Sequence, residues 1–437
     1  MSASRSQTTT RRGFLLGAGA GLAAGMPAAW LGLRTLDGWN HSGETGPVFT
    51  GRSPEIPRPE FPMPGPFPGR VIEAHRDGVV RPDNSICHES VRAMMDRGLR
   101  ELTGADSAIE TWRRFFKPGD VVGIKVNPVG RKYSPKQSEA ISSPAVVIEV
   151  VAGLKNAGVK PRDIILFERY AHQFRGAGYE ALLRERSMDG VRWYASSVEY
   201  EDRQVDIEGH DFSADRDPHV VGYDPDVFVY MGYASPAHDH KDDRRFRSHL
   251  SVIVSRLVNK IVTIPVLKDH GSGGVTLTLK NLSHGLNNNV ARSHLTGMVR
   301  RDGSVSGPNQ CNTFIPTAAG QQIIRQKATL HILDGLVGVY QGGPSRGLNW
   351  PYQSLFFGTD PVALDHVGWD IIDRKRVREG LPVVARVGLS GTTPAERAGE
   401  HFDRRQPEHI ALAETIGLGV FDPRRIDHRR INLNQTS

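Results

Sequence analysis

Short apolar runs rich in β-branched and aromatic residues alternate along the chain with amphipathic segments. The runs predict strands at residues 121–126, 163–168, 226–231, 260–264, 328–333 and 354–358. The amphipathic segments predict helices at residues 88–100, 145–157, 177–187, 248–257, 318–326, 361–374 and 407–416. Parallel strands need a crossover connection, usually a helix, so this alternation predicts an α/β fold. We expect a layered fold with a largely parallel central sheet flanked by helices.

Two other patterns precede this alternation. Residues 1–33 place Arg11 and Arg12 before a weakly apolar, Gly/Ala-rich run, which is typical of a twin-arginine export signal. Residues 34–69 are rich in proline, which predicts an extended linker. We therefore expect residues 70–437 to form a single α/β domain. The signal predicts an exported protein that uses the twin-arginine machinery. Its location would be periplasmic, or membrane-tethered on the outer side of the inner membrane, with cleavage and a retained anchor both open.

Cysteine content and charge exclude several classes of protein. The chain has two cysteines, Cys87 and Cys311, so a disulfide framework and a thiolate-bound iron–sulfur cluster are excluded. The two thiols could pair or stay separate. The net charge is +7, but Arg5, Arg11 and Arg12 lie in the predicted signal, which leaves about +4 for the rest. Basic residues alternate with acids and lack interleaved aromatics, so we expect no nucleic-acid partner.

Polar and charged side chains follow the predicted strands. In open α/β sheets, ligands bind beyond the carboxyl ends of the strands, so we expect these side chains to line one cleft. Asp360 precedes a proline and is also a typical helix cap. Glu168 could do no more than pair with Arg169. The residues concerned are Lys125, Asn127, Glu168, Arg169, Asp334, Asp360 and Asp365.

The densest group of donors follows the strand predicted at 260–264. Glycines at 273 and 274 free the backbone N–H groups to surround an anion, although the segment matches no nucleotide-binding fingerprint. Residues 275–286 fit both a strand and a helix. Their apolar residues alternate with polar ones, as in a strand, but they also form one apolar stripe along a helix. We favour the helix, which places three polar residues on one face near the glycines. These are Thr276, Lys280 and His284, and the donors around them are Lys268, His270, Asn281, Arg292 and His294.

A histidine pair lies earlier in the chain, at His238 and His240. Two histidines in a charged loop, without a visible third ligand, fall short of a metal site.

Four motifs in this order resemble the domain of unknown function 362 family. The resemblance extends from about Arg70 to near Gly419, and this chain lacks the ferredoxin-like cysteines that many members carry. The family's name defines no reaction. The resemblance implies a shared site at Lys125, Asn127, Lys268, His270, Thr276, Lys280, Asn281, Asp334, Asp360 and Asp365. The motifs are GDVVGIKVN (119–127), PVLKDHGSGGVTLTLKN (265–281), ILDGLVG (332–338) and FGTDPVALD (357–365).

Two functions fit these residues. The first is an exported enzyme that binds a small anionic molecule and transfers a proton, with a lysine base of lowered pKa as a variant. Its predicted catalytic residues are His270, Lys280, His284, Asp334 and Asp365. Its predicted substrate-binding residues are Lys125, Asn127, Lys268, Gly273, Gly274, Thr276, Asn281 and Arg292. The second is a non-catalytic binder of a metal or cofactor, with ligands among His270, His284, His294, Asp360 and Asp365.

Overall fold

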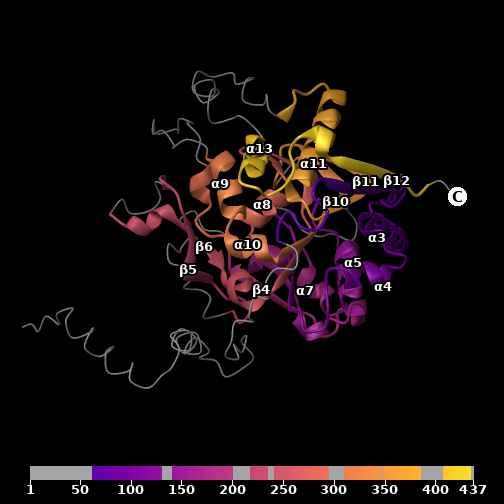
Figure 1. Ribbon diagram of the computed structural model, residues 1–437, viewed down its shortest axis with the longest axis horizontal. Coiled ribbons are helices and arrows are strands. Elements are labelled where there is room, and N and C mark those ends of the chain that lie inside the picture. The colour runs from indigo at the N-terminus through magenta and orange to yellow at the C-terminus, as the bar shows by residue number, and fades with distance from the viewer. Residues whose placement is uncertain are drawn as a thin grey trace, which may run out of the picture. The chain divides into compact units, whose positions relative to one another are not determined.

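The computed structural model describes residues 62–129, 140–199, 217–234, 241–294, 310–345, 347–384 and 407–434 (Figure 1). All of them belong to the compact unit Ser53–Ser437. The predicted export signal, most of the predicted linker and the His238/His240 pair lie outside the described residues.

A ten-stranded sheet forms the centre of the molecule. Its strands are β1 (Arg70–His75), β2 (Val122–Lys125), β3 (Ile164–Tyr170), β4 (Arg192–Ser197), β7 (Lys260–Thr263), β8 (Val266–His270), β9 (Gly274–Thr276), β10 (Ala328–Gln341), β11 (Leu348–Gly358) and β12 (Asp427–Asn432). The order is β12-β1-β11-β10-β7-β2-β3-β4, with β8 beside β10 and β9 beside β8. Strands β10, β7, β2, β3 and β4 run parallel, and β11 and β9 are antiparallel to their neighbours. The largely parallel α/β sheet is therefore as predicted.

Helices cover both faces of the sheet (Figure 1). In β2, Val122 and Ile124 join the apolar cluster that contains residues of α3 and α5, so the alternate residue Lys125 faces the opposite side. There its Cε lies 3.0 Å from where a Cβ on Gly285 would sit, just beyond the end of α8. The helices are α3 (His88–Thr103), α4 (Ala108–Arg113), α5 (Pro144–Asn156), α6 (Ala171–Gly176), α7 (Tyr179–Leu182), α8 (Thr278–Ser283), α9 (Cys311–Ala319), α10 (Gln322–Lys327), α11 (Pro361–Arg378) and α13 (Glu408–Thr415).

Four predicted helices differ from the structure. The helix predicted at 177–187 is the short α7 followed by a 3₁₀ turn (Arg186–Met188), and the helix predicted at 318–326 is divided between α9 and α10. Residues 248–257, predicted as a helix, form most of β6 (Arg247–Ser251) and a π-helical turn (Ile253–Leu257), because β6 pairs with β5 (Tyr223–Tyr230) in a separate two-stranded sheet. The helix predicted from Val275 begins only at Thr278. The residues before it form the β8–β9 hairpin, in which Lys268 lies opposite Thr276.

Asp360 is a helix cap, as its position before a proline predicted. Its carboxylate accepts hydrogen bonds from the backbone N–H groups of Val362 and Ala363 in the first turn of α11. It also accepts from the N–H groups of Gly69 and Val420, both 2.9 Å away. One buried carboxylate therefore joins the start of β1, the start of α11 and a C-terminal segment.

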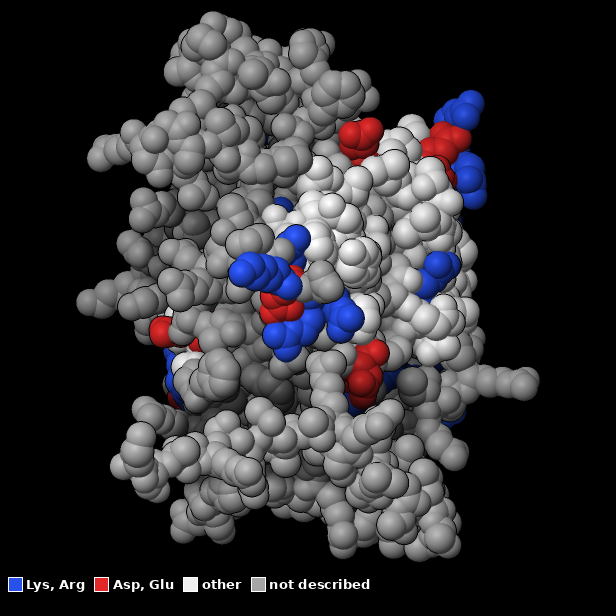
Figure 2. Space-filling view, turned by 90° about the vertical axis from the view of Figure 1, so that its left-hand side faces the viewer, with Lys and Arg blue, Asp and Glu red and all other residues white. Residues whose placement is uncertain are grey.

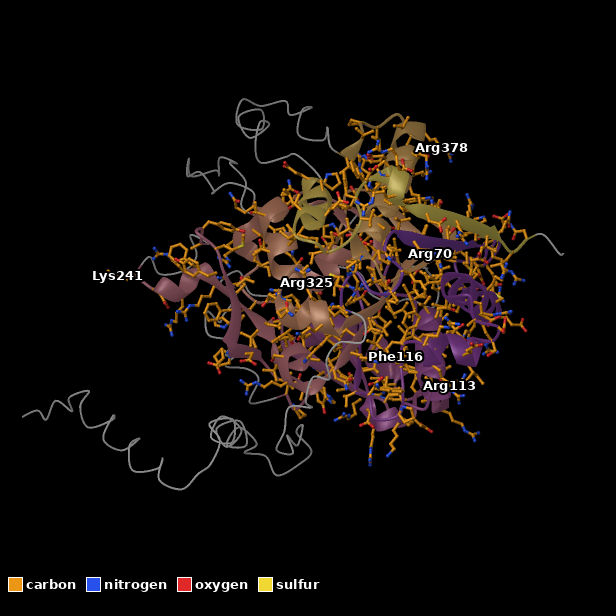
Figure 3. The ribbon with its side chains drawn as sticks, in the orientation of Figure 1. Arg70, Arg113, Phe116, Lys241, Arg325 and Arg378 are labelled. Atoms are coloured by element: carbon orange, nitrogen blue, oxygen red, sulfur yellow. The ribbon has the colours of Figure 1, made fainter. Side chains whose placement is uncertain are left out.

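Side chains at the surface are mixed in charge. Phe116, which follows α4 in the chain, is buried, whereas Arg113 at the end of α4 points outward (Figure 3). On the described part of the face in Figure 2, Lys and Arg side chains lie among Asp and Glu. None of the described helices is both long and apolar enough to cross a membrane. Cys87 and Cys311 are not joined in a disulfide, and Cys311 is buried.

Candidate functional site

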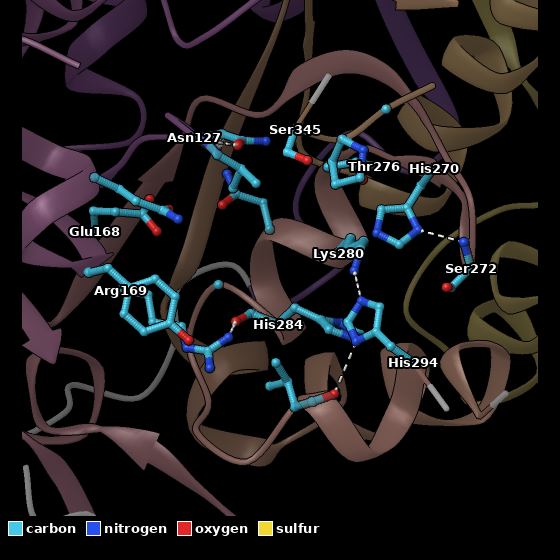
Figure 4. Close-up of a pocket in the computed structure, with 18 of the residues that line it drawn as sticks. Asn127, Glu168, Arg169, His270, Ser272, Thr276, Lys280, His284, His294 and Ser345 are labelled. Carbon is cyan, nitrogen blue, oxygen red and sulfur yellow. Dashed lines mark hydrogen bonds between the residues drawn. The ribbon is translucent and has the colours of Figure 1, made fainter. Parts of the chain in front are cut away.

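A cavity of about 570 Å³ opens at the carboxyl ends of β2, β3 and β8 (Figure 4). This is the edge at which parallel sheets bind ligands. The hairpin β8–β9, helix α8, the 3₁₀ turn Ala291–His294 and the segment after β10 complete its wall. Its polar lining residues are Lys125, Asn127, Glu168, Arg169, Tyr170, Gln173, His270, Ser272, Thr276, Lys280, Asn281, His284, His294 and Ser345.

The first cation of the cavity, Lys125, is held by Glu168. Lys125 Nζ lies 2.6 Å from Glu168 Oε2 and 2.7 Å from the carbonyl oxygen of Val126, and both charged side chains are almost fully buried. Burial lowers the pKa of Lys125, and the nearby carboxylate opposes that shift. Sequence analysis had suggested Arg169 as the partner of Glu168; the structure places Lys125 there instead.

The second cation, Lys280, has no acidic partner in the described part of the chain. Its Nζ lies 3.1 Å from His294 Nε2 on the adjoining turn. Burial lowers the pKa of Lys280 to about 8. The titratable groups that interact with it are His270, His284, His294, His409, Cys311 and Arg169.

Hydrogen bonds fix the tautomer of His294. Its Nδ1 lies 3.1 Å from the carbonyl oxygen of Val290, which can only accept, so Nδ1 carries the proton. Nε2 is then the acceptor for a proton of the Lys280 amine. Burial and the neighbouring Lys280 lower the pKa of His294 to about 3, so the imidazole is neutral.

The third cation, Arg169, is the last residue but one of β3 and lines one side of the cavity. Its Nη1 donates to the carbonyl oxygen of His284 and its Nε to Tyr223 Oη, at 3.1 and 3.3 Å. The guanidinium also stacks 4.5 Å from the ring centre of Tyr170. These contacts hold a permanent positive charge in a fixed position.

The glycine turn binds a histidine of its own chain. The backbone N–H groups of Ser272 and Gly273 donate to His270 Nδ1 at 3.0 and 2.8 Å. Gly273 and Gly274, where an anion cradle was predicted, are not among the residues that line the cavity, and the turn joins two strands and does not open a helix. Because Nδ1 accepts, His270 Nε2 carries the ring proton and acts as a donor.

Two cavity side chains carry polar atoms without a hydrogen-bond partner among the described residues. They are Thr276 Oγ1 and Asn281 Nδ2. Both residues are buried, with exposed fractions of 5% for Thr276 and 4% for Asn281. Buried polar atoms are nearly always hydrogen-bonded, and those that are not call for a specific explanation. Both atoms belong to the set predicted to bind substrate.

Four other predicted residues do not line the cavity. Asp365 accepts from the N–H groups of Thr278 and Leu279 and so caps α8, while Asp334 accepts from Ser143 and Leu336. Arg292 donates to the carbonyl oxygens of Asn289, Tyr233 and Phe246 and to Ser248 Oγ, and Lys268 lies in β8 opposite Thr276. Asp365 and Asp334 thus bind backbone N–H groups, and Arg292 binds mainly backbone carbonyl oxygens; their catalytic and substrate-binding roles stay predictions.

His284 lines the cavity, but both of its ring nitrogens are occupied. Nε2 lies 2.8 Å from Ser293 Oγ and Nδ1 lies 3.1 Å from Ser283 Oγ. Its predicted role as a proton carrier would require breaking one of these bonds. Lys280 and His294 form the more accessible proton-carrying pair.

The predicted metal ligands are brought together only in part. His270, His284 and His294 line the cavity, whereas Asp360 and Asp365 bind backbone N–H groups elsewhere. A different group, His284, His294 and Cys311, has one ligand atom per residue within 4.8 Å of each other. Ser293 Oγ lies among them, with contacts of 2.8, 3.3 and 3.9 Å, so a hydrogen-bonded hydroxyl links these three side chains.

Glu168 and Arg169 were expected to line the cleft but were not among the predicted catalytic or substrate-binding residues. Both directly follow the apolar part of β3, which neighbours β2 in the sheet. The rule that ligands bind beyond strand ends was therefore sufficient to find them. What the sequence lacked was the information that Glu168 pairs with Lys125 across the two strands.

Comparison with known proteins finds a match to one family over part of the chain. Residues 241–370 match the sequence model described as domain of unknown function (DUF362), which confirms the resemblance indicated by the motifs. No curated protein matches the chain. A crystal structure of a Thermotoga maritima protein, a structural-genomics target, is similar at 11% sequence identity with a TM-score of 0.32. That alignment covers 66% of this chain and 59% of that chain, so this chain spans less than two thirds of the other protein.

Proposed function

We propose, for a chain whose residues 241–370 carry the DUF362 domain, that the cavity binds a small anionic molecule and that Lys280 exchanges a proton with it. The observation that carries the proposal is the balance of charge. Lys125, Lys280 and Arg169 line the cavity, and the acidic residue among the described lining residues, Glu168, already pairs with Lys125. Lys280 therefore faces the cavity with an imidazole, and no carboxylate among the described residues, as its partner, and a buried cation is stabilised when an anion meets it.

Neutral donors support the same interpretation. Thr276 Oγ1 and Asn281 Nδ2 lack partners among the described residues, and His270 presents Nε2–H. Carboxylate and phosphate oxygens accept several hydrogen bonds at once, which matches a wall of donors.

Proton transfer follows from the state of Lys280. A pKa of about 8 lets this amine exist in both protonation states near neutral pH, which is the condition for a general acid or base. An anion bound beside it would favour the ammonium form and raise that pKa.

Calorimetric titration with oxalate and inorganic phosphate tests the binding. We expect one of these anions to bind, and Lys280→Met or Arg169→Met to weaken its binding by about tenfold, since a charge-assisted hydrogen bond is lost. Lys160→Met and Arg113→Met are the matched controls, because both side chains are exposed and far from the lining set. Binding that is equal in all four variants, or absent for both anions, would contradict the proposal.

Proton linkage tests the second part. At pH 8, binding of the anion should be accompanied by proton uptake, seen as a heat that depends on the buffer's ionisation enthalpy. Lys280→Met should abolish the uptake. Uptake that persists in this variant would assign the proton to another group. Stoichiometric nickel, zinc or iron in tag-free protein would instead favour the alternative, a binder of metal or cofactor.

We also propose export by the twin-arginine route, on the basis of Arg11 and Arg12 and the segment that follows them. Replacing both arginines with lysine should keep the protein in the cytoplasmic fraction, whereas replacing Arg5 should not. Normal export of the double variant would exclude this route.

A further inference from the structure

We propose that Lys280 forms an imine with the carbonyl group of a 2-oxo acid, whose carboxylate is bound beside Arg169. This inference rests on the proposed anion site and specifies its substrate class as a small acid that carries an aldehyde or ketone next to its carboxylate. The geometric basis is that Lys280 presents a buried amine to the cavity with a neutral imidazole as its hydrogen-bond partner.

The two lysines of the cavity differ in the way that imine chemistry requires. Lys125 is held as an ammonium by Glu168 at 2.6 Å, and an ammonium has no lone pair to attack a carbonyl carbon. Lys280 pairs with no carboxylate in the described chain, and His294 Nε2 accepts one of its N–H groups. That hydrogen bond orients the amine and leaves the nitrogen lone pair directed elsewhere.

The protonation state supports the geometry. With a pKa of about 8, Lys280 has a neutral fraction near neutral pH that is more than about a hundred times that of an exposed lysine. Buried lysines of this kind serve as imine-forming nucleophiles.

The reaction balances without a further reagent. The nitrogen of neutral Lys280 adds to the carbonyl carbon, the C=O π electrons move to oxygen, and a proton passes from nitrogen to that oxygen. Loss of water then forms the C=N bond, so the amine and the 2-oxo acid give an imine and one water. His270 Nε2–H lies in the same cavity to donate to the carbonyl oxygen, and its ring centre is 5.4 Å from that of His294.

Reductive trapping tests the inference on the purified chain. Glyoxylate or pyruvate is added with sodium cyanoborohydride, and the modified lysine is located by peptide mass spectrometry. We expect Lys280 to be modified at least about tenfold faster than Lys125 or the exposed Lys160, and oxalate to slow this reaction in the unaltered protein. Lys280→Met should remove the rapid phase, and Lys160→Met should leave it unchanged.

Trapping of a neutral aldehyde distinguishes the contribution of the Arg169 charge from that of the Lys280 amine. Arg169→Met should slow trapping of glyoxylate by about tenfold while leaving trapping of propionaldehyde nearly unchanged. Modification spread over exposed lysines, with none at Lys280, would overturn the inference. If oxalate still bound under those conditions, the anion site would stand and only the imine would be excluded. If oxalate and phosphate both failed to bind, the two proposals would fail together.

Discussion

The buried pair Lys125–Glu168 makes a quantitative prediction about stability. The two side chains are 2% and 3% exposed, and their charged atoms are 2.6 Å apart. Removing one partner leaves an uncompensated charge in the interior, which destabilises a protein by about 3–5 kcal/mol. We therefore expect Lys125→Met and Glu168→Gln each to lower the free energy of unfolding by about that amount.

The double variant should be more stable than either single variant. With both charges removed, no ion remains unpaired, and replacing a whole buried pair by neutral groups is often close to neutral. The expected coupling between the two positions is at least about 2 kcal/mol, well above the scatter of about 0.5 kcal/mol seen for independent sites.

An exposed ion pair provides the control. Arg374 and Asp370 on α11 have the same N–O distance of 2.6 Å, but each is 53% exposed. Arg374→Met should change the free energy of unfolding by at most about 0.5 kcal/mol. Guanidinium chloride unfolding followed by far-UV circular dichroism measures the four variants and the unaltered protein at pH 7. Additive effects at Lys125 and Glu168, or single losses no larger than that of Arg374→Met, would refute the reasoning.

Three further predictions concern other buried charges. Lys280→Met should stabilise the fold below pH 8 by up to about 3 kcal/mol, because the folded pKa of about 8 lies below the unfolded value. This gain should disappear between pH 8 and 10, as measured by chemical unfolding across that range. Asp360→Ala should destabilise by about 3 kcal/mol or more, since four backbone N–H groups lose their acceptor; thermal and chemical unfolding would show it. Burial raises the pKa of Asp365 to about 7, above its unfolded value, so its contribution to stability is present below pH 4 and lost as pH rises to 7. The stability of the unaltered protein relative to Asp365→Asn should therefore fall over that interval, and a rise would contradict the assignment.

The sequence was most informative where a short run of apolar residues has polar residues at both ends. The strands at 121–126, 163–168 and 260–264 were found because their apolar runs are short and are bounded by polar residues. The segment from Val275 to Leu279 was ambiguous for a physical reason. Its residues are buried on both sides, so neither the strand period nor the helical period separates an inner from an outer face. Pairing with β8, a contact between chain segments, decided the outcome.

The site was predictable by residue type, and only partly by role. Lys125, His270 and Lys280 converge on one cavity because each follows or neighbours a strand end on the same edge of the sheet. Asp334 and Asp365 have the same residue type as a catalytic acid, but their oxygens point to backbone N–H groups. For these two residues nothing in the linear pattern distinguishes a carboxylate that meets a substrate from one that binds backbone groups, whereas the proline after Asp360 identified that residue as a helix cap.

The position of β1 in the sheet has a consequence for synthesis of the chain. This strand is the first of the described sheet to leave the ribosome, yet its two neighbours, β11 and β12, come from the last quarter of the sequence. Throughout most of translation its apolar residues Val71, Ile72 and Ala74 have no strand on either side, although all three are fully buried in the finished sheet. An unpaired apolar strand is a site for aggregation or for chaperone binding. β1 is therefore the first strand of the described sheet to be synthesised and one of the last to pair with its neighbouring strands.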